Sequence, residues 1–595
     1  MFSTEQQLGA IRRASLKVQA TTEQLAQKET TSRLLANVVN ECLVNSMILK
    51  ASTAEEGSLW MCITARPRPS ESLAQRGLEN NSKIWISLSS VDIELAEGVD
   101  VVISHGIIDP EDFLFPVIIE SEAGFKTENS PGAVFDIMYP WFGDDHSSSI
   151  RSETIRELED SAANQARWLE LAAKTPLPEL SSPSIAWEKS MIRGHPTHPM
   201  HKTCLAQSPL QDLQPSDFPR IINPGISFVS IPISDVRLAG NFQDTIAPLL
   251  SACGVAAAEE GRVIAPCLSM QLPSIAQRFP SAKVVDSNQI TAEAQASLRT
   301  VSLPSELNFP YHLKFPLACK VTSAVRTITP WTTCVGPELS VLLESVMDKD
   351  FWPLKEVASL AGAQENFSDA RHLSCLVRED LEIRARAQGE ALIVASGLAE
   401  RDAENKVTNV ERVLGLDTVE KKLDWLRGYA RKLFEVTIPL LSRYGICLES
   451  HGQNILVRLG LSDGALKGFA VRDLGGIRMH LPTLRKCGFE LKTALPGSSI
   501  ITEDIHEVWS KAYHTLIQNH LNQFIHGLSI QGEGGWRVVK EELKGVLAME
   551  QGETARELEM FFFAERVPFK CFMRMQMASV YRNYIYEEVP NMLLR

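Results

Sequence analysis

Apolar residues recur at helical spacing in several long segments of the chain. This spacing predicts amphipathic helices within residues 31–50 and over residues 151–174, and the longest predicted helix covers residues 419–445. In the first segment the apolar positions are Leu34, Leu35, Val38, Val39, Cys42, Leu43 and Met47. In the second segment they are Ile155, Leu158, Ala162 and Leu169.

Alternation of apolar and polar residues predicts strands elsewhere. The predicted strand regions are residues 83–104, 226–234 and 312–329. Helices dominate from about residue 370 onward, where a predicted strand pair at 455–460 and 468–476 interrupts them. The methionine and aromatic spacing of residues 569–593 is typical of a helix in a core.

The chain is too long for a single hydrophobic core. It has 595 residues, and single cores stop growing near roughly 250–300 residues. A Pro/Ser-rich stretch at 175–184 is typical of a linker. We therefore predict a mixed α/β (α+β) multidomain chain with three domains. The predicted domains are residues 1–185, 186–370 and 371–595.

Charge and cysteine content narrow the classes of function. The formal net charge is −14, so the chain has no long-range attraction for nucleic acid or for an anionic membrane. Eleven cysteines without a CxxC pair are typical of reduced thiols. No apolar run reaches the roughly 18 residues that a membrane span needs, and the N-terminal residues lack the apolar core of a signal peptide. We expect a cytoplasmic protein that binds neither nucleic acid nor a membrane.

The segment GHPTHPMHKT at residues 194–203 concentrates three histidines, a lysine and two prolines. The prolines prevent a regular helix, so His195, His198 and His201 project from an extended or turning loop. Together with Lys202 they suit an anion such as a carboxylate or a phosphate. Two alternatives stay open: a polar loop whose histidines cap backbone groups, and a zinc site, although the segment contains no Cys or acid. If the histidines titrate freely, lowering the pH toward about 6.5 should tighten acid binding.

The segment KVTSAVRTIT at residues 320–329 places one arginine among hydroxyl side chains. Arg326, with Ser323 and Thr327 beside it, would form a fork for phosphate oxygens at the end of a strand. The alternative is an ordinary strand with an exposed edge.

Two further segments combine acids, amides and a histidine, namely ESHGQN at residues 449–454 and RD at 472–473. Glu449 and Asp473 are hard oxygen ligands of the kind that Mg²⁺ prefers. Asn454 adds a possible carbonyl ligand, and His451 can donate to a phosphate. The alternative is a polar turn whose groups satisfy one another.

The acid that a protein kinase would use as a base is missing from this segment. Kinases carry HRDxxxxN, in which the Asp positions or deprotonates an attacking hydroxyl. Here Gln453 stands near His451 and cannot act as a base. A carboxylate nucleophile is already ionised at neutral pH and needs no base. The segment therefore suits a site that binds Mg·ATP and lets a carboxylate attack phosphorus.

In this order, the segments resemble the NRPS-independent siderophore synthetases, the aerobactin-synthetase-like family. The matching segments are GHPTHPMHK at 194–202, HLKFPLACKVTSAVRT at 312–327, GPELS at 336–340, ESHGQN at 449–454, RD at 472–473, and the terminal FMRMQM and VPNML. HPxHPxxK together with ExHGQN is highly specific for the family. The resemblance runs from about residue 187 to the end of the sequence.

The resemblance implies a cupped hand with an N-terminal thumb, β-rich fingers and a distantly kinase-like palm. Such enzymes use ATP and Mg²⁺ to activate a carboxylate, often of citrate or a related polycarboxylate, as an acyl-adenylate. An amine or hydroxyl of a polyamine, amino acid or amino alcohol then attacks, with release of AMP and pyrophosphate. Homodimers are common in the family.

The resemblance also implies roles for individual residues. Ser323, Arg326 and Thr327 would meet the phosphate and adenylate, and His451 and Asn454 would lie near the α-phosphate and the substrate carboxylate. Glu449 and Asp473 would serve the metal, while His195, His198 and Lys202 would line the carboxylate pocket. Arg326 and His451 would be the catalytic residues.

Some positions depart from the family pattern. Ala206 stands where a glycine is usual, PCLSMQ at 266–271 lacks the usual His-Pro-Trp, and no Lys or Arg lies between Arg326 and Lys349. These departures affect the substrate pocket more than the nucleotide pocket. Two alternatives to a ligase stay open: a kinase-like phosphotransferase, which the missing acid disfavours, and a catalytically weak partner subunit.

Overall fold

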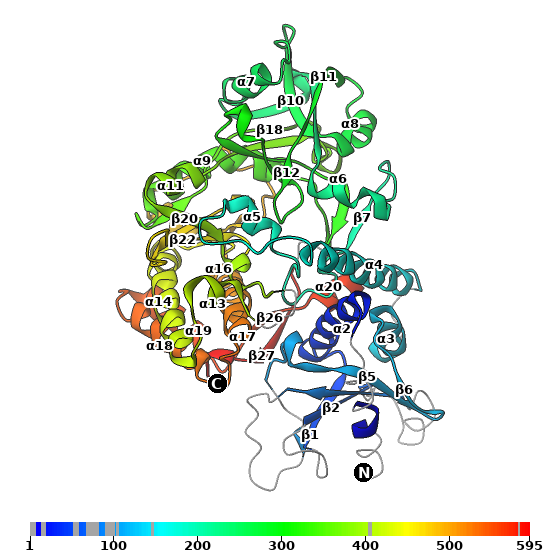
Figure 1. Cartoon of the computed structure of the whole chain (residues 1–595). Helices are drawn as coiled ribbons and strands as arrows, with labels where there is room; N and C mark the ends of the chain where they lie inside the picture. The colour runs from blue at the N-terminus through cyan, green and yellow to red at the C-terminus, as the bar shows by residue number, and fades with distance from the viewer. Residues whose placement is uncertain are drawn as a thin grey trace.

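The computed structural model describes most of the chain. The described residues are 8–12, 20–50, 59–66, 82–89, 101–102, 106–143, 148–402, 407–580 and 584–594. Helices and strands alternate along them, as expected for a mixed α/β fold. In Figure 1 the N-terminal sheet lies at the bottom, the strands from the middle of the chain lie at the top, and the C-terminal helices lie on the left. None of the described helices is both long and apolar enough to cross a membrane.

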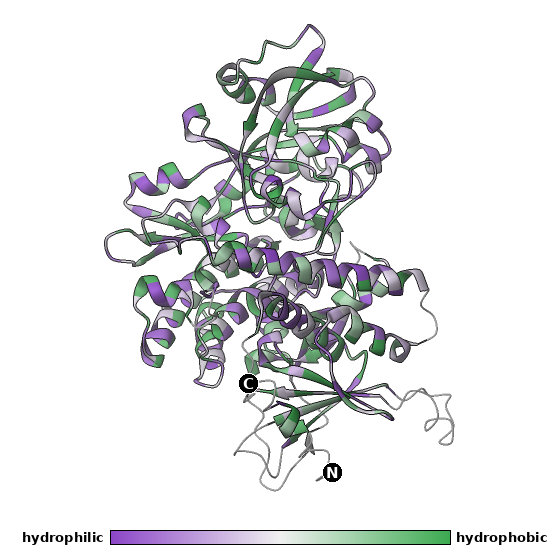
Figure 2. Ribbon diagram, turned by 45° about the vertical axis from the view of Figure 1, so that its right-hand side comes forward, coloured by the Kyte–Doolittle hydropathy of each residue, from purple (hydrophilic) through white to green (hydrophobic). Residues whose placement is uncertain are grey.

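A six-stranded antiparallel sheet, in the order β4-β1-β2-β3-β5-β6, forms the N-terminal part. Apolar residues of its strands and of the helices beside it share one core, and Figure 2 shows these strands mostly in green. The elements are α2 (Thr22–Asn40), β1 (Asn45–Lys50), β2 (Leu59–Thr64), β3 (Lys83–Leu88), β4 (Val101–Val102), β5 (Phe113–Ser121), β6 (Gly124–Thr127), α3 (Pro131–Met138) and α4 (Ser148–Ala172). The predicted strand region 83–104 therefore contains β3 and β4, while residues 90–100 and 103–104 lie outside the described residues.

The helix predicted within residues 31–50 is wrong beyond Asn40. Cys42 adopts a left-handed φ of 53° just after α2, which turns the chain away from the helix axis. Met47 instead lies in β1, opposite Cys62 of β2. The helix predicted over 151–174 is confirmed as α4.

Three sheets follow, with the strand orders β10-β8-β11, β12-β13-β14-β19-β18-β9 and β16-β15-β7. The helices are α5 (Ser184–Lys189), α6 (Phe218–Ile222), α7 (Phe242–Ala252), α8 (Leu272–Arg278), α9 (Pro330–Val346) and α10 (Phe367–Ala370). The first strands are β7 (Cys204–Ala206), β8 (Gly225–Pro232), β9 (Val236–Gly240), β10 (Arg262–Leu268), β11 (Lys283–Thr291) and β12 (Glu293–Ala294). The others are β13 (Thr300–Ser302), β14 (Tyr311–Lys314), β15 (Cys319–Val321), β16 (Ala324–Val325), β18 (Glu356–Gly362) and β19 (Ser374–Glu379).

The strand region predicted at 312–329 is broken into β14, β15 and β16. Pro316, which has no N–H to donate to a ladder, lies between the first two strands. Thr322 has a left-handed φ of 57° and makes the tight turn between the last two. Arg326 consequently lies on the loop after β16 and not on a strand.

The C-terminal part is built around a four-stranded sheet in the order β17-β23-β22-β20 and a set of long helices. The predicted strand pair is confirmed by β22 and β23, which pair antiparallel, and the predicted long helix is confirmed by α14. The strands are β17 (Phe351–Pro353), β20 (Glu390–Val394), β21 (Ile446–Cys447), β22 (Ile455–Gly460), β23 (Leu466–Val471), β24 (Arg478–His480), β25 (Ile501–Thr502), β26 (Arg566–Lys570) and β27 (Tyr586–Pro590). The helices are α11 (Glu382–Ala387), α12 (Ala395–Ala399), α13 (Asn409–Leu414), α14 (Val419–Tyr444), α15 (Leu481–Lys486), α16 (Ile505–Ala512), the π-helical η9 (Tyr513–Leu521), α17 (Asn522–Gly527), α18 (Gly535–Leu547), α19 (Glu553–Phe562) and α20 (Phe572–Met577).

The helix expected across residues 569–593 is wrong except at α20. The segment forms a strand–helix–strand unit in which β26 and β27 pair antiparallel. Figure 1 shows α20, in red, beside α2 and α4 from the N-terminal part. The Nε2 of Gln576 donates to Glu157 of α4 at 2.9 Å. The end of the chain therefore packs against its beginning, next to the segment 194–203.

Candidate functional site

One cavity of about 390 Å³ brings together segments that lie far apart in the sequence. It is bordered by the loop 194–203, the hairpin of β15 and β16, the turn 449–454 and the strand β26. All ten predicted site residues line it, namely His195, His198, Lys202, Ser323, Arg326, Thr327, Glu449, His451, Asn454 and Asp473. The ten residues selected from the sequence therefore lie around one cavity.

The histidine loop turns tightly because its imidazoles accept hydrogen bonds from its own backbone. The Nδ1 of His195 accepts from the N–H groups of Thr197 at 3.3 Å and His198 at 3.1 Å. The Nδ1 of His198 accepts from the N–H of Met200 at 3.1 Å. A neutral imidazole that accepts at Nδ1 has its proton on Nε2. The backbone capping considered from the sequence is thus present, and it leaves each Nε2 as a donor.

The two Nε2 atoms have different surroundings. That of His195 lies 3.3 Å from Nδ2 of Asn519, which is also a donor, so a hydrogen bond between them requires the amide to turn its oxygen toward the ring. That of His198 is buried without a hydrogen-bond partner among the described residues, although the side chain borders the cavity. A buried donor left unpaired costs free energy of about 1–3 kcal/mol. His198 therefore has an unused donor that a ligand oxygen in the cavity would satisfy.

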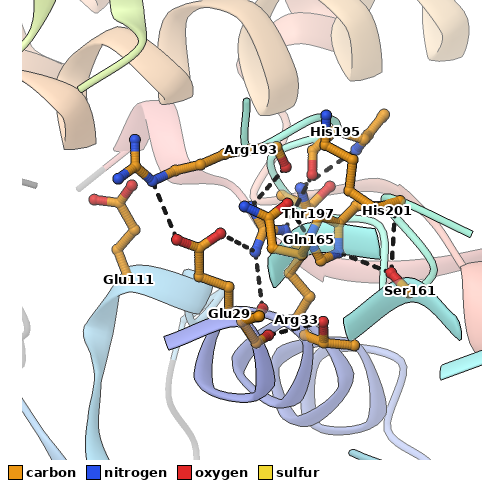
Figure 3. A network of polar contacts seen from close by, with 12 residues as sticks. Glu29, Arg33, Glu111, Ser161, Gln165, Arg193, His195, Thr197 and His201 are labelled. Carbon is orange, nitrogen blue, oxygen red and sulfur yellow. Dashed lines mark hydrogen bonds and ion pairs between the residues drawn. The ribbon is translucent and has the colours of Figure 1, made fainter. Parts of the chain in front are cut away.

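His201 is engaged on the other side of the loop. Its Nε2 lies 3.2 Å from Oε1 of Gln165 and its Nδ1 lies 3.4 Å from Oγ of Ser161, both on α4 (Figure 3). Among the described residues, no group of three or more His, Cys, Asp or Glu side chains is arranged to hold a metal ion. The three histidines thus do not meet as a triad around one point.

Burial determines the charge of this loop. It lowers the pKa of His195, His198 and His201 well below 6.5. The histidines are therefore neutral at neutral pH and do not titrate freely, so they do not meet the condition under which acid binding was expected to tighten near pH 6.5.

Lys202 does not carry a fixed positive charge. Burial lowers its pKa to about 7, although Glu400 and Glu29 oppose the shift. Its ammonium lies 4.2 Å from the ring centroid of Trp168 and donates to the carbonyl of Met191 at 3.4 Å. Lys202 therefore changes charge near neutral pH.

The hairpin orders Arg326 through its own turn. The Nε of Arg326 donates to the carbonyl of Val321 at 3.1 Å, and its Nη2 donates to Oγ1 of Thr322. Thr322 is held in the left-handed region that favours glycine. Such positions cluster where a surrounding structure fixes a functional conformation. Nη1 has no hydrogen-bond partner among the described residues, and Arg326 lines the cavity.

Both acids of the predicted metal side are paired with lysines. Lys511 lies 3.4 Å from Oε1 of Glu449, and Lys314 forms an ion pair with Asp473. Burial alone would raise the pKa of both carboxyls, but the nearby cations outweigh it and lower each pKa below its usual value. The two carboxylates are therefore ionised and can bind a cation.

Two backbone features bring these acids into place. Asp473 has a left-handed φ of 67°. A Cβ at Gly476 would lie only 1.9 Å from Oε2 of Glu449, so the absent side chain makes room for that carboxylate. Next to Asp473, Arg472 forms a bidentate ion pair with Glu188 of α5 and donates to the carbonyl of Gln453 at 3.1 Å. Arg472 joins two parts of the chain behind the site.

Sequence reasoning missed several basic and aromatic residues that line the same cavity. They are Lys314, Lys511, His514, Lys570, Phe572 and Tyr584. The Nζ of Lys570 lies 3.9 Å from the ring centroid of Tyr584 and 5.1 Å from that of Phe572. Lys570 has no ion pair with any described residue. The alternating pattern F-K-C-F at 569–572 was the available signal, because it turns Lys570 away from the buried side of β26.

Comparison with known proteins extends the match along the whole chain. The family model described as "IucA / IucC family" matches residues 241–400, and the one described as "Ferric iron reductase FhuF-like transporter" matches residues 423–585. The NRPS-independent siderophore synthetase-like protein ankE of Aspergillus thermomutatus is 38% identical over 575 residues, covering 95% of this chain and 92% of the relative. The NRPS-independent siderophore synthetase rfs of Rhizopus delemar is 30% identical over 622 residues, covering 96% and 97%. The D-ornithine–citrate ligase of Staphylococcus aureus is 25% identical over 338 residues, 51% of each chain.

Solved structures share the fold at low sequence identity. The petrobactin biosynthesis protein AsbB of Bacillus anthracis superposes with a TM-score of 0.75 and 15% identity, covering 96% of each chain. The ATP-bound aerobactin synthetase IucA of Klebsiella pneumoniae superposes with a TM-score of 0.70 and 12% identity, covering 97% of this chain and all of that one.

Proposed function

Because the chain belongs to the NRPS-independent siderophore synthetase family and is an enzyme of siderophore biosynthesis, we propose that it activates a carboxylate with Mg·ATP as an acyl-adenylate and condenses it with an amine or hydroxyl. The observation on which the proposal rests is the single cavity that brings Arg326, His451 and the two ionised acids together with the histidine loop. The proposal is supported because side chains of the types that suit phosphate, metal and carboxylate line one cavity.

The proposed reaction has two steps. A carboxylate oxygen of the acid attacks the α-phosphorus of ATP, and the bond from that phosphorus to pyrophosphate breaks. The nucleophile then attacks the acyl carbon, the bond to AMP breaks, and the nucleophile loses a proton. No group of the protein has to deprotonate a carboxylate that is already ionised, which agrees with Gln453 in the lining where a kinase has an acid.

We assign the phosphate side to Ser323, Arg326 and Thr327, with His451 and Asn454 next to the α-phosphate. A guanidinium fixed by Val321 and Thr322 keeps its geometry while charge grows on the phosphate oxygens. Preorganised donors of this kind lower the barrier because they need no reorientation during the reaction.

Glu449 and Asp473 fit a magnesium ion that arrives with ATP. Mg²⁺ is usually held by one or two carboxylates, substrate phosphates and water, and the site offers two ionised carboxylates of this kind. When bound, the ion would neutralise charge on the phosphates. Lys511 and Lys314 would share or release the carboxylates as it binds.

The acid pocket is proposed to lie between the histidine loop and β26. His198 offers an unpaired Nε2 donor, and Lys202 and Lys570 offer positive charge. Citrate or a related polycarboxylate suits these donors, and the D-ornithine–citrate ligase is named for such an acid with an amine. For this chain, we propose a polyamine, amino acid or amino alcohol as the nucleophile.

The wider setting follows the same family pattern. We propose that residues 1–185, 186–370 and 371–595 are the thumb, fingers and distantly kinase-like palm of a cupped hand, and that the enzyme acts in the cytoplasm as a homodimer. All eleven cysteines are free thiols, which suits a reducing compartment.

The nucleotide product tests the proposal. The enzyme is incubated with Mg·ATP, citrate and hydroxylamine, and AMP, ADP and pyrophosphate are measured. We expect AMP and pyrophosphate in equal amounts. ADP with a phosphorylated substrate would identify a kinase-like phosphotransferase. If neither nucleotide forms with citrate, a citryl monoamide, a succinyl hydroxamate or 2-oxoglutarate, the chain is a catalytically weak partner subunit.

A further inference from the structure

One face of α2 carries a line of polar side chains that points away from solvent. Glu29, Arg33, Asn37 and Glu41 follow one another at intervals of four residues, which places them on the same side of a helix. Arg33, Asn37 and Glu41 are only 6%, 2% and 0% exposed. Polar groups are buried at a cost unless they are hydrogen-bonded, so this face needs partners inside the molecule.

Two of these side chains hold the histidine loop by its carbonyl groups. The Nε of Arg33 donates to the carbonyl of His195 at 3.0 Å, and its Nη2 donates to that of Arg193 at 3.4 Å (Figure 3). The Nδ2 of Asn37 donates to the carbonyl of Thr197 at 2.7 Å. The donors thus fix three carbonyls within residues 193–197, at the start of the histidine loop.

Arg193, the residue just before the histidine loop, forms ion pairs on two sides. The Nε of Arg193 lies 3.2 Å from Oε1 of Glu29, and its Nη1 lies 2.7 Å from Oε1 of Glu400, which follows α12. The same Nη1 donates to the carbonyl of Arg401 at 3.0 Å. Arg193 therefore ties the loop to α2 on one side and to the C-terminal part on the other.

Glu41, at the C-terminal end of the polar face, holds the helix that carries Phe572, and the Phe572 ring packs on His198. The carboxyl oxygens of Glu41 accept from the N–H groups of Met573 and Arg574, each at 2.8 Å. The guanidinium of Arg574 returns a bond to the carbonyl of Glu41 at 2.8 Å. These contacts fix α20, whose Phe572 ring lies 4.5 Å from the ring of His198 between centroids.

We propose that the polar face of α2, formed by Arg33, Asn37 and Glu41, positions the Nε2 of His198 for the acid substrate. The inference rests on the proposed function, in which this loop binds the acid. None of the three side chains lines the cavity, so they are positioning residues. The N-terminal part thereby determines acid affinity without touching the acid, because a displacement of about 1 Å in a substrate-binding group can cost as much as 10²-fold.

The test measures KM for citrate, KM for ATP and kcat by AMP release with hydroxylamine. In Arg33→Ala we expect KM for citrate to rise by about tenfold to a hundredfold, with KM for ATP nearly unchanged. Arg33→Lys should recover part of the loss, because one of the two donors to the loop can be replaced. Asn37→Ala, a smaller change to the same loop, should act in the same direction.

A double-mutant cycle separates positioning from general damage. If Arg33 acts through His198, then Arg33→Ala should have little further effect on KM for citrate in a His198→Ala background. Arg262 provides the matched control, because its guanidinium also donates to backbone carbonyls, to that of Ser230 at 2.7 Å and to that of Ser281 at 2.9 Å. Arg262 lies in β10 and does not line the cavity. Arg262→Ala should leave both KM values unchanged.

The outcomes are distinguishable. A wild-type enzyme that releases no AMP with citrate, a citryl monoamide, a succinyl hydroxamate or 2-oxoglutarate contradicts the proposed function. If His198→Ala raises KM for citrate but Arg33→Ala and Asn37→Ala do not, the function stands and the inference is wrong. Equal losses for citrate and ATP, or full additivity with His198→Ala, would show that α2 has only a structural role.

Discussion

The ammonium of Lys511 lies 3.4 Å from a carboxyl oxygen of Glu449, in a part of the cavity where only 12% and 26% of these two side chains are exposed. In such a pair, each group stabilises the charged form of the other. The pKa of Lys511 is therefore raised and that of Glu449 is lowered. A magnesium ion at Glu449 would therefore meet a cation already present. Lys511 would compete with the metal ion for Glu449, and it also keeps the Glu449 carboxylate ionised.

This competition predicts opposite effects from the two partners. Glu449→Gln should raise the Mg²⁺ concentration for half-maximal AMP release by roughly tenfold or more, since a lost charged contact costs about 1.5–3 kcal/mol. Asp473→Asn should act in the same direction. Lys511→Met should lower the Mg²⁺ requirement, because the metal no longer competes with an ammonium.

The control for the lysine change is Lys432, which pairs with Asp350 at 3.0 Å outside the cavity lining. Lys432→Met should leave the Mg²⁺ requirement unchanged. If Glu449→Gln and Lys511→Met change the Mg²⁺ requirement in the same direction, or if neither changes it, Glu449 has a structural role and does not bind the metal ion.

Gly476 is expected to tolerate no side chain. A Cβ there would lie 1.9 Å from Oε2 of Glu449, so Gly476→Ala must displace that carboxylate or its own turn. We expect turnover to fall by about 10- to 100-fold, as for other misplacements of a reacting group, and the Mg²⁺ requirement to rise. Both are measured by AMP release over a magnesium series.

Gly428 provides the comparison for that change. It lies within α14, and a Cβ there would meet nothing within 4 Å. Gly428→Ala should raise the free energy of unfolding by about 0.5–1 kcal/mol, because alanine is the better helix residue, and should leave turnover intact. Full activity in Gly476→Ala would mean that Glu449 does not need its observed position.

Arg326 should contribute to the chemical step more than to binding. Arg326→Ala removes a guanidinium that Val321 and Thr322 hold in place, and we expect kcat to fall by about 10²–10³. Arg326→Lys should recover only part of this, since an ammonium cannot replace a planar fork. Near-normal turnover in an Arg326→Ala variant that retains the wild-type circular dichroism spectrum would contradict the assignment.

The site was predictable where several reactive side chains follow one another in the sequence. His198 and Asp473 belong to such segments, and both line the cavity. Lys511 is a single lysine in α16, and its local spacing does not distinguish it from a solvated lysine. For Lys570, the alternation at residues 569–572 indicates only that the side chain leaves the buried side of β26. Their place in the cavity follows from the packing of these elements, which one sequence does not reveal.

The fold was predictable where an element is long and periodic. The 3.6-residue period of α14 extends over 26 residues and indicated the helix correctly. The C-terminal segment was misread because β26 is only five residues long and is stabilised by its pairing with β27. Likewise α2 ends just before Cys42, which adopts a left-handed conformation. The helical spacing continues past this point, but the chain turns there into β1, which pairs with β2.

Acid affinity should depend on pH through Lys202. Burial lowers its pKa to about 7, so the ammonium that attracts a carboxylate is lost as the pH rises through neutrality. We expect kcat/KM for the acid, which reports the free enzyme, to fall above pH 7. Lys202→Arg stays charged and should not show this decline. The ratio of wild type to Lys202→Arg at each pH cancels the ionisation of ATP and of the acid, and a ratio that stays constant across neutrality would exclude titration of Lys202.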